Sequence, residues 1–144
     1  MHQSIDYFSE DINFKLKRKK EISLWLQAVI EQEGYALEQL NFIFCSDSYL
    51  HGYNKHYLNH DTLTDVITFD YATKEKTIYG DIYISIERIK ENAAMYQEAF
   101  LRELYRVMLH GLLHLLTYKD ATLDEKKLMR AKEAYYLTKR STLT

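Results

Sequence analysis

The stretch that decides the fold is VMLHGLLHLLTYKD, residues 107–120, an apolar run that contains two histidines and ends in a polar turn. His110 and His114 are four residues apart. On an α-helix, side chains at this spacing lie on one face with their Cβ atoms about 5–6 Å apart. That separation suits two imidazoles that bind one cation, so the stretch predicts a helix with a metal-binding face.

Asp120 can join the two histidines only if this helix ends before it. It lies six residues after His114, and a continuing helix would carry it about 9 Å further along the axis. Bonds from protein ligands to zinc are only about 2 Å long. Thr122-x-x-Glu125 is a capping box that opens a new helix, so the chain can fold back. We therefore predict a site for one zinc ion, or another divalent transition metal, with His110, His114 and Asp120 as ligands.

The pair of histidines, His110 and His114, allows three other interpretations. A buried histidine can be satisfied by core hydrogen bonds alone, but two at this spacing favour a metal. Position 111 is Gly where a zincin peptidase carries its Glu base, which disfavours a peptidase. A ferrous oxygenase also uses two histidines and a carboxylate, but here all three come from one helix and its following turn. Gly111 costs a helix about 1 kcal/mol relative to Ala, and predicts that substrate or a neighbouring strand approaches the backbone there.

The composition predicts one ordered domain, residues 1–144. The chain has 144 residues, of which 47% are hydrophobic, and a chain of this length buries about 68–70% of its unfolded surface. Its net charge of −2 excludes a polyanion binder by overall charge, so any nucleic-acid contact needs a local patch. The densest basic cluster is KLKRKK, residues 15–20, followed by Lys126, Lys127, Arg130 and Lys132. Either cluster is equally compatible with a solvated helix face.

The single cysteine, Cys45, excludes an intramolecular disulfide and is typical of a reducing cytoplasm. Residues 1–6 do not resemble a signal peptide, and no apolar run approaches 18 residues. We expect a cytoplasmic protein without a membrane partner.

Hydrophobic periodicity predicts the remaining elements. An amphipathic stripe of Ile22, Trp25, Leu26, Val29 and Ile30 marks the clearest helix, and the last helix is expected to turn Leu128, Ala131 and Tyr135 inward. The tail 138–144 is predicted to fray. The predicted strands are 3–8, 40–45, 65–71 and 78–85, and the predicted helices are 19–33, 46–57, 87–96, 99–116 and 123–137. This order of elements indicates an α/β or α+β domain with the central helix packed across the sheet.

Several stretches together resemble one family. The pattern His110-Gly-x-x-His114-Leu-Leu-x-Tyr118-x-Asp120 is similar to the signature of YbeY-type endoribonucleases, which are bacterial rRNA maturation factors. In that family the pattern runs His-Gly-x-Leu-His-Leu-x-Gly-Tyr-Asp-His. Residues 54–69, NKHYLNHDTLTDVITF, and residues 80–85, GDIYIS, resemble two further family motifs in family order. The resemblance spans roughly residues 40–137.

The resemblance implies an α+β fold, in which a small mixed sheet of about four strands is flanked by helices and carries the zincin-like metal helix. It implies one zinc held by the three motif ligands. It also implies a hydrolase, an endoribonuclease of single-strand type, that acts in 16S rRNA 3′ end maturation and in small-subunit biogenesis and quality control. The implied partners are rRNA, the small ribosomal subunit and a ribosome-assembly GTPase.

The chain departs from the family at the site itself. The third ligand is Asp120 instead of His, which lowers the net charge of a zinc site to +1, makes a bound water less acidic and favours harder metals. Thr117 replaces the family Gly, so the turn lacks a residue that adopts positive φ easily. Lys119 replaces the family Asp and brings a positive charge beside the site.

Leu58 stands where the family has an Arg that is a candidate for binding the scissile phosphate. Loss of such a cation can cost transition-state stabilisation of several kcal/mol. Candidates to replace it are Lys55, His56, His60 and Lys119, of which we take His60 and Lys119 as tentative phosphate contacts. His51, His56 and His60 are otherwise interpreted as surface residues that would contact RNA if they line the cleft.

The predicted chemistry is cleavage of RNA by a water activated at His110, His114 and Asp120, or by a 2′-hydroxyl with the metal as Lewis acid. Asp65 and Asp81 are expected as partners for the far ring nitrogens of the histidines, and Arg106 either faces the cleft or pairs with Glu103. The alternative function is a non-catalytic ribosome-assembly factor that binds RNA and carries a structural metal. Structural zinc normally has four protein ligands, so three ligands favour catalysis.

Overall fold

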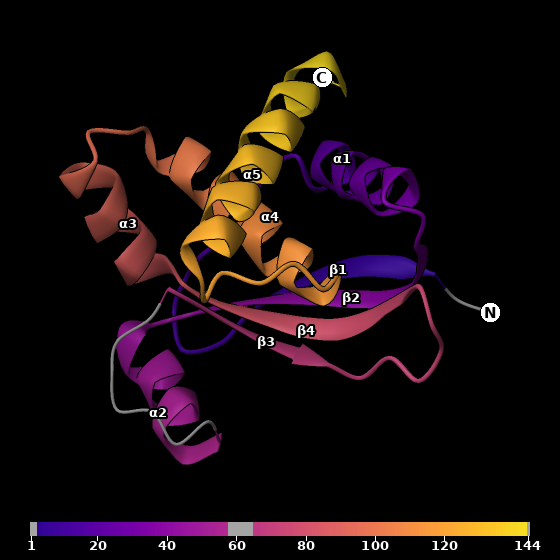
Figure 1. The fold of residues 1–144 in the computed structure, drawn as a ribbon. Coiled ribbons are helices and arrows are strands. Elements are labelled where there is room, and N and C mark those ends of the chain that lie inside the picture. The colour runs from indigo at the N-terminus through magenta and orange to yellow at the C-terminus, as the bar shows by residue number, and fades with distance from the viewer. Residues whose placement is uncertain (1–2, 58–64, 144) are drawn as a thin grey trace.

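The core of the fold is a mixed sheet (Figure 1). The computed structural model describes the backbone of residues 3–57 and 65–143, and the side chains of residues 3–52 and 65–140. In this part of the chain, β1 (Ser4–Ser9), β2 (Ala36–Cys45), β3 (Val66–Asp70) and β4 (Thr77–Ser85) form one sheet in the order β1-β2-β4-β3. β1 is parallel to β2 and β2 to β4, whereas β3 is antiparallel to β4.

The helices cover both faces of this sheet unequally (Figure 1). α1 (Lys19–Gln32), α4 (Phe100–Leu115) and α5 (Leu123–Leu143) lie on one side, and α2 (Asp47–Tyr57) lies on the other. α3 (Ile86–Met95) follows β4 directly and packs beside α4. The predicted α+β fold, with a small mixed sheet flanked by helices and the histidine helix packed on it, is confirmed.

α4 is the centre of the main core because it is apolar on almost all sides. Successive β4 side chains point to opposite faces, and the face toward α4 carries Ile78, Ile82 and Ile84, all buried. Gly111 allows the close approach: a Cβ at this position would lie 2.7 Å from Cγ2 of Ile82. The neighbour that requires this glycine is therefore a strand and not substrate. The buried apolar side chains of α4 include Leu104, Met108, Leu109, Leu112 and Leu113.

The stripe predicted for α1 packs as expected, with all five of its apolar side chains buried. Trp25 of this stripe also donates a hydrogen bond from Nε1 to the backbone carbonyl of Tyr136, at 2.8 Å. The indole is fully buried, so its N–H needs such a partner. This contact fixes α5 against α1.

The face predicted for α5 is wrong. Leu128, Ala131 and Tyr135 are exposed, and Met129, Glu133 and Tyr136 are buried instead. The physical reason is that a carboxylate occupies the inward stripe, because Glu133 has partly buried hydrogen-bond partners on α4, Arg106 and His110, which the sequence of α5 does not reveal. The helical backbone also continues to Leu143, where a frayed tail was expected.

α2 covers the opposite face with a smaller cluster of Cys45, Leu50 and Ile67. Ser46 caps this helix, since its Oγ accepts a hydrogen bond from the backbone N–H of Tyr49 at 3.1 Å. Burial raises the pKa of the Cys45 thiol to about 12, so it is not a reactive thiolate near neutral pH. Among the described residues, no helix combines the length and apolar character that crossing a membrane requires.

Candidate metal centre

α4 ends in a turn that sends the chain back toward its own histidines. The backbone N–H of Thr117 donates to the carbonyl of His114 at 2.9 Å, and that of Tyr118 donates to the carbonyl of Leu113 at 3.0 Å. This pair of bonds is a Schellman motif, which needs a left-handed residue directly after the C-cap. Thr117 occupies that position with φ 74°, so the turn forms despite the missing glycine.

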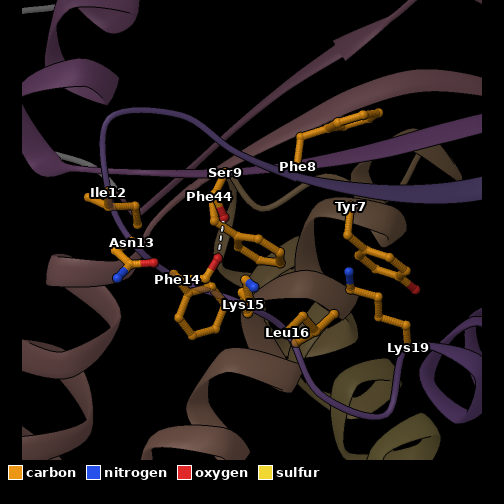
Figure 2. Close-up of a pocket in the computed structure, with 10 residues that line it drawn as sticks. All are labelled: Tyr7, Phe8, Ser9, Ile12, Asn13, Phe14, Lys15, Leu16, Lys19 and Phe44. Atoms are coloured by element: carbon orange, nitrogen blue, oxygen red, sulfur yellow. Dashed lines mark hydrogen bonds between the residues drawn. The ribbon is translucent and has the colours of Figure 1, made fainter.

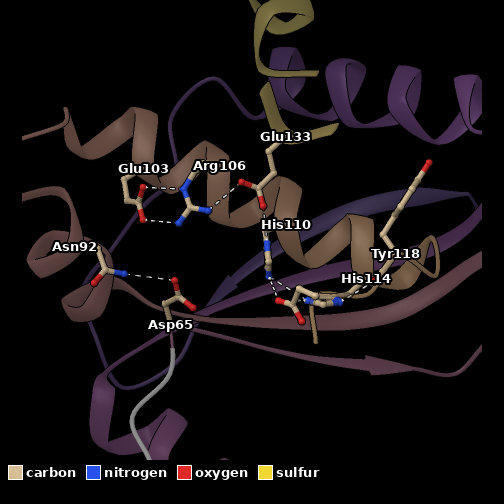
Figure 3. Close-up of polar contacts among 9 residues, drawn as sticks. Asp65, Asn92, Glu103, Arg106, His110, His114, Tyr118 and Glu133 are labelled. Atoms are coloured by element: carbon tan, nitrogen blue, oxygen red, sulfur yellow. Dashed lines mark hydrogen bonds and ion pairs between the residues drawn. The ribbon is translucent and has the colours of Figure 1, made fainter. Parts of the chain in front are cut away.

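The turn brings three ligand atoms together. Nε2 of His110 lies 3.0 Å from Nε2 of His114. Oδ2 of Asp120 lies 3.3 Å from the first of these nitrogens and 3.4 Å from the second. Figure 3 shows the imidazoles of His110 and His114 directed to one point beside α4. The structure therefore brings together the three residues that the sequence spacing singled out.

The other nitrogen of each ring is held by a group that accepts hydrogen bonds. Nδ1 of His110 lies 2.7 Å from Oε2 of Glu133, and Nδ1 of His114 lies 3.1 Å from the carbonyl oxygen of Tyr118. A carbonyl and a carboxylate can only accept, so each Nδ1 carries the hydrogen. In the neutral rings both Nε2 atoms then present lone pairs.

With both rings neutral, three electron-pair donors face one another across little more than 3 Å, an arrangement that a cation between them stabilises. Tetrahedral ligands with bonds of about 2.0–2.1 Å stand about 3.3–3.4 Å apart, which matches the spacing of these three atoms. Two imidazole nitrogens and one carboxylate oxygen are donors that zinc accepts. The residues present therefore fit a divalent transition metal, and no fourth protein ligand joins them among the described residues.

Glu133 belongs to a chain of charged groups that leads away from the centre (Figure 3). Nη1 of Arg106 donates to Oε1 of Glu133 at 3.1 Å, and its Nε and Nη2 donate to both carboxylate oxygens of Glu103 at 3.0 and 2.8 Å. Burial acts to raise the pKa of Glu133, but the hydrogen bond from His110 and the charge of Arg106 outweigh it, so this pKa is lowered. Glu133 therefore stays ionised and holds His110.

The sequence-based expectation that Asp65 and Asp81 are the partners of the histidines is wrong, because Glu133 and the Tyr118 carbonyl hold the two Nδ1 atoms. Asp81 points away from α4 and accepts hydrogen bonds from Asn41 and Tyr71, because the alternation of β4 places it on the opposite face from Ile82. Asp65 lies on the α4 side of the sheet, where it accepts a hydrogen bond from Asn92 at 3.4 Å. Burial raises the pKa of Asp65, and the nearby His110 and Arg106 offset this only in part.

The residues that hold the histidines were missed. Glu133 could have been found from one signal: Met129, Glu133 and Tyr136 stand at positions i, i+4 and i+7, which places a carboxylate within an apolar helical stripe. Glu33 was also missed. It accepts a hydrogen bond from the hydroxyl of Tyr118 at 2.6 Å, and so anchors the turn from which the Tyr118 carbonyl reaches His114.

The predicted phosphate contacts remain predictions. Lys119 is exposed in the turn, directly before Asp120. His60 and Leu58 lie outside the described residues, as do the side chains of Lys55 and His56. The expectation that Arg106 pairs with Glu103 is met, and the same guanidinium also serves Glu133.

Comparison with known proteins identifies the family of this chain. A sequence model described as Endoribonuclease YbeY matches residues 4–141. The chain belongs to the YbeY endoribonuclease family. The predicted family is thereby confirmed.

YbeY relatives match over nearly their whole length. The chain is 58% identical to the endoribonuclease YbeY of Amoebophilus asiaticus, over 93% of this chain and 91% of the relative. It is 47% identical to that of Cytophaga hutchinsonii, over 91% and 92%. The solution structure of TM1509 from Thermotoga maritima is similar with a TM-score of 0.65 and 27% identity, and the match covers 95% of this chain and 89% of that one.

Proposed function

We propose that this chain is a metal-dependent endoribonuclease that cleaves single-stranded segments of ribosomal RNA at the centre formed by His110, His114 and Asp120. The observation that carries the proposal is the convergence of three potential ligand atoms, each within 3.4 Å of the others. The two rings are oriented from behind by Glu133 and by the Tyr118 carbonyl, which accept hydrogen bonds from the Nδ1 atoms. Membership in the YbeY family supports RNA as the substrate.

Each residue has a separate task. His110 and His114 supply neutral nitrogens, and Asp120 supplies the charge that holds a divalent ion, preferably zinc. A zinc ion bound there would act as a Lewis acid on phosphate oxygen and lower the pKa of a bound water to about 7. Glu133 and the Tyr118 carbonyl keep both rings in the required tautomer. Lys119 and His60 are the proposed contacts to the scissile phosphate, in the absence of an Arg at position 58.

The proposed place of this reaction is 16S rRNA 3′ end maturation and small-subunit biogenesis and quality control in the cytoplasm. Its proposed partners are rRNA, the small ribosomal subunit and a ribosome-assembly GTPase. The open coordination position favours catalysis over a purely structural metal, because three ligands within the described part of the chain leave room for water or a phosphate oxygen.

RNA cleavage after metal removal and return tests the proposal. Purified protein would be treated with a chelator, dialysed, and given zinc or manganese before incubation with structured rRNA fragments. We expect cleavage that is lost on chelation and restored by one of the metals, and no cleavage by Asp120→Asn under any condition. Asp120→His, which restores the third ligand usual in the family, should retain activity.

Two outcomes would contradict the proposal. Cleavage that persists in the chelated Asp120→Asn variant would place the chemistry elsewhere. Metal binding and rRNA binding without cleavage in any sample would favour the non-catalytic assembly factor.

A further inference from the structure

The basic cluster singled out in the sequence forms one wall of a groove that the metal centre does not use. Side chains 12–17 of the segment before α1 alternate between inside and outside: Leu16 is buried, whereas Lys15 and Lys17 are exposed. Lys15 and Lys17 both line the same groove. Both lysines therefore project away from the core.

The inner side chains of this segment fix it to the sheet and to α4 (Figure 2). The ring of Phe14 packs edge to face against Phe44, with centroids 5.1 Å apart, and against Phe100 at the start of α4, at 6.1 Å. The Ser9 hydroxyl donates to the carbonyl of Phe14. The lysines are thus presented from a backbone that is anchored on its inner side.

The groove itself has a volume of about 730 Å³ and runs between this segment, the start of α4 and the end of α5. No acidic residue lines it in the described part of the chain. Ring stacking orients one of its cations, because the guanidinium of Arg140 lies 4.5 Å from the ring centroid of Tyr105. Its cationic lining residues are Lys15, Lys17, Arg18, Arg102 and Arg140.

These cations are available to a ligand. No ion pair involves Lys15, Lys17 or Arg140 among the interactions of the described residues. Arg18 is 3.9 Å from Glu21 and Arg102 is 3.2 Å from Glu98, and in both pairs the side chains are largely exposed. Exposed pairs of this kind contribute little, so a phosphate can compete for both guanidinium groups.

A second hollow adjoins the groove. Arg102 also lines this hollow, whose other cations are Arg106 and Arg130. Arg106 in turn donates to Glu133, which holds His110. Along α4, Arg102 precedes His110 by eight residues, which is about 12 Å of helix axis. Glu98 and Glu103 also line this second hollow, but Glu103 is buried and paired with Arg106.

We propose that this groove binds the phosphate backbone of the RNA strand that extends from the metal centre, so that Lys15, Lys17, Arg18, Arg102 and Arg140 form a second RNA contact remote from the cleaved bond. The inference rests on the proposed function for the identity of the polyanion. RNA fits better than an acidic protein because Arg102 of the groove also lines the adjacent hollow, whose Arg106 donates to the Glu133 that holds His110. A chain with a net charge of −2 needs such a local patch to retain RNA.

Binding of RNAs of two lengths tests the groove separately from the centre. Fluorescence anisotropy with labelled single-stranded RNAs of about four and about sixteen nucleotides would be recorded in chelator, so that nothing is cleaved. The Lys15→Glu/Lys17→Glu variant should bind the long RNA about tenfold more weakly and lose about 1.4 from the salt slope, because each phosphate contact contributes about 0.7 for single strands. Its affinity for the short RNA should not change.

The matched control is Lys74→Glu/Lys90→Glu, which changes the net charge equally at two exposed lysines outside the groove. Equal long-RNA affinity in the groove variant and this control would overturn the proposal. Loss of poly-glutamate binding with unchanged RNA binding would also overturn it, in favour of an acidic protein. Cleavage of the short RNA by the groove variant is scored independently, so failure of the groove and failure of the nuclease are distinguishable.

Arg18→Gly tests whether the Arg18 charge contributes to RNA binding without lowering the stability of the fold. Arg18 has φ 59°, a conformation that glycine adopts without the steric cost an L-residue incurs. The variant should therefore melt no lower than the wild type and still bind the long RNA several-fold more weakly. Unchanged affinity in this variant would remove Arg18 from the groove contact.

Discussion

At the scale of single residues, the conformation of Thr117 decides where the third ligand lies. A left-handed residue at this position closes the Schellman motif, and the chain then returns Asp120 to within 3.4 Å of the histidine nitrogens. A β-branched residue is a poor choice for positive φ. The turn is therefore held by its surroundings, among them the hydrogen bond from Tyr118 to Glu33.

Replacing Thr117 with glycine should stabilise the protein. The left-handed conformation costs an L-residue about 1–2 kcal/mol, and glycine avoids most of this cost. Urea unfolding should show a gain of about 1 kcal/mol with metal binding retained. Thr138→Gly in α5 is the matched control and should destabilise by about a few tenths of a kcal/mol, because glycine is less favourable than threonine inside a helix. A loss of stability in Thr117→Gly comparable to that control would contradict the role given to this residue.

Glu133 should control metal affinity without touching the metal. Glu133→Gln removes the charge behind His110, and changes to such supporting groups typically weaken metal binding 10–100-fold. Competition with a chromophoric chelator measures this directly. Asp124→Asn, at an exposed position near the start of the same helix, should leave the affinity unchanged. Equal affinities in the two variants would show that Glu133 does not support the site.

Spacing alone predicted which three residues converge, because two of them share a helix face and the third follows a chain reversal marked by a capping box. That box is present: Thr122 and Glu125 exchange hydrogen bonds of 2.9 and 3.1 Å. Glu133 was not predicted, since its role depends on α5 crossing α4. That contact is set by packing between distant segments and leaves only a weak local signal.

At the scale of elements, the contact between α4 and β4 positions the whole centre. Gly111 lies between the two histidines, and its missing side chain lets the helix approach Ile82 of the strand. The helix is thus fixed in depth and rotation at the point where its histidines project.

Gly111→Ala should destabilise the protein although alanine is the better helix former. The added Cβ would lie 2.7 Å from Cγ2 of Ile82 and 3.4 Å from Cγ2 of Val66, and both neighbours are β-branched and stiff. Overpacking typically costs about 1–3 kcal/mol, against a gain of about 1 kcal/mol in helix propensity. Thermal unfolding of Gly111→Ala beside Gly52→Ala, where a Cβ meets nothing, checks this. A variant at position 111 that gains as much stability as the control would refute the close packing.

Hydrophobic periodicity predicted the elements that have one strong apolar stripe. It failed for α5, whose buried face is determined by polar contacts. α1 and α4 have such stripes, and their bounds agree with the prediction to within one residue at each end. β2 begins at Ala36, four residues before its apolar run, because pairing with β4 extends to Ala36 and Thr77. The order of the strands in the sheet was beyond sequence reasoning, since the apolar patterns of β1, β2 and β4 do not say which edges meet.

At the scale of the whole molecule, Glu33 connects α1 and α5 to the turn that follows α4. It follows α1 directly and accepts hydrogen bonds from Tyr118 in the turn and from Lys132 and Tyr136 in α5. Burial acts to raise the pKa of Glu33, but the hydrogen bonds from Tyr118, Tyr136 and Lys132 outweigh it and lower this pKa.

The acid stability of the protein should therefore depend on Glu33. A carboxyl with a lowered pKa in the folded state contributes stability that is present above its unfolded pKa of about 4.3 and is lost as the pH falls through the folded value. The stability difference between wild type and Glu33→Gln should thus be largest near neutral pH and shrink below about pH 4.5. Urea unfolding at several pH values measures this, with Glu31→Gln on the exposed part of α1 as control. A difference that does not change with pH would exclude the ionised carboxylate as its source.

The most direct test of the metal centre is the metal content of the purified protein. Inductively coupled plasma mass spectrometry would be applied to the wild type, to His114→Ala, and to His51→Ala as a histidine of α2 that supplies none of the three ligand atoms. The same samples would be assayed for cleavage of rRNA fragments. We predict close to one zinc, or another divalent transition metal, per chain in the wild type and in His51→Ala, and loss of both metal and cleavage in His114→Ala. Absence of bound metal from the wild type, or full metal content in His114→Ala, would contradict the account.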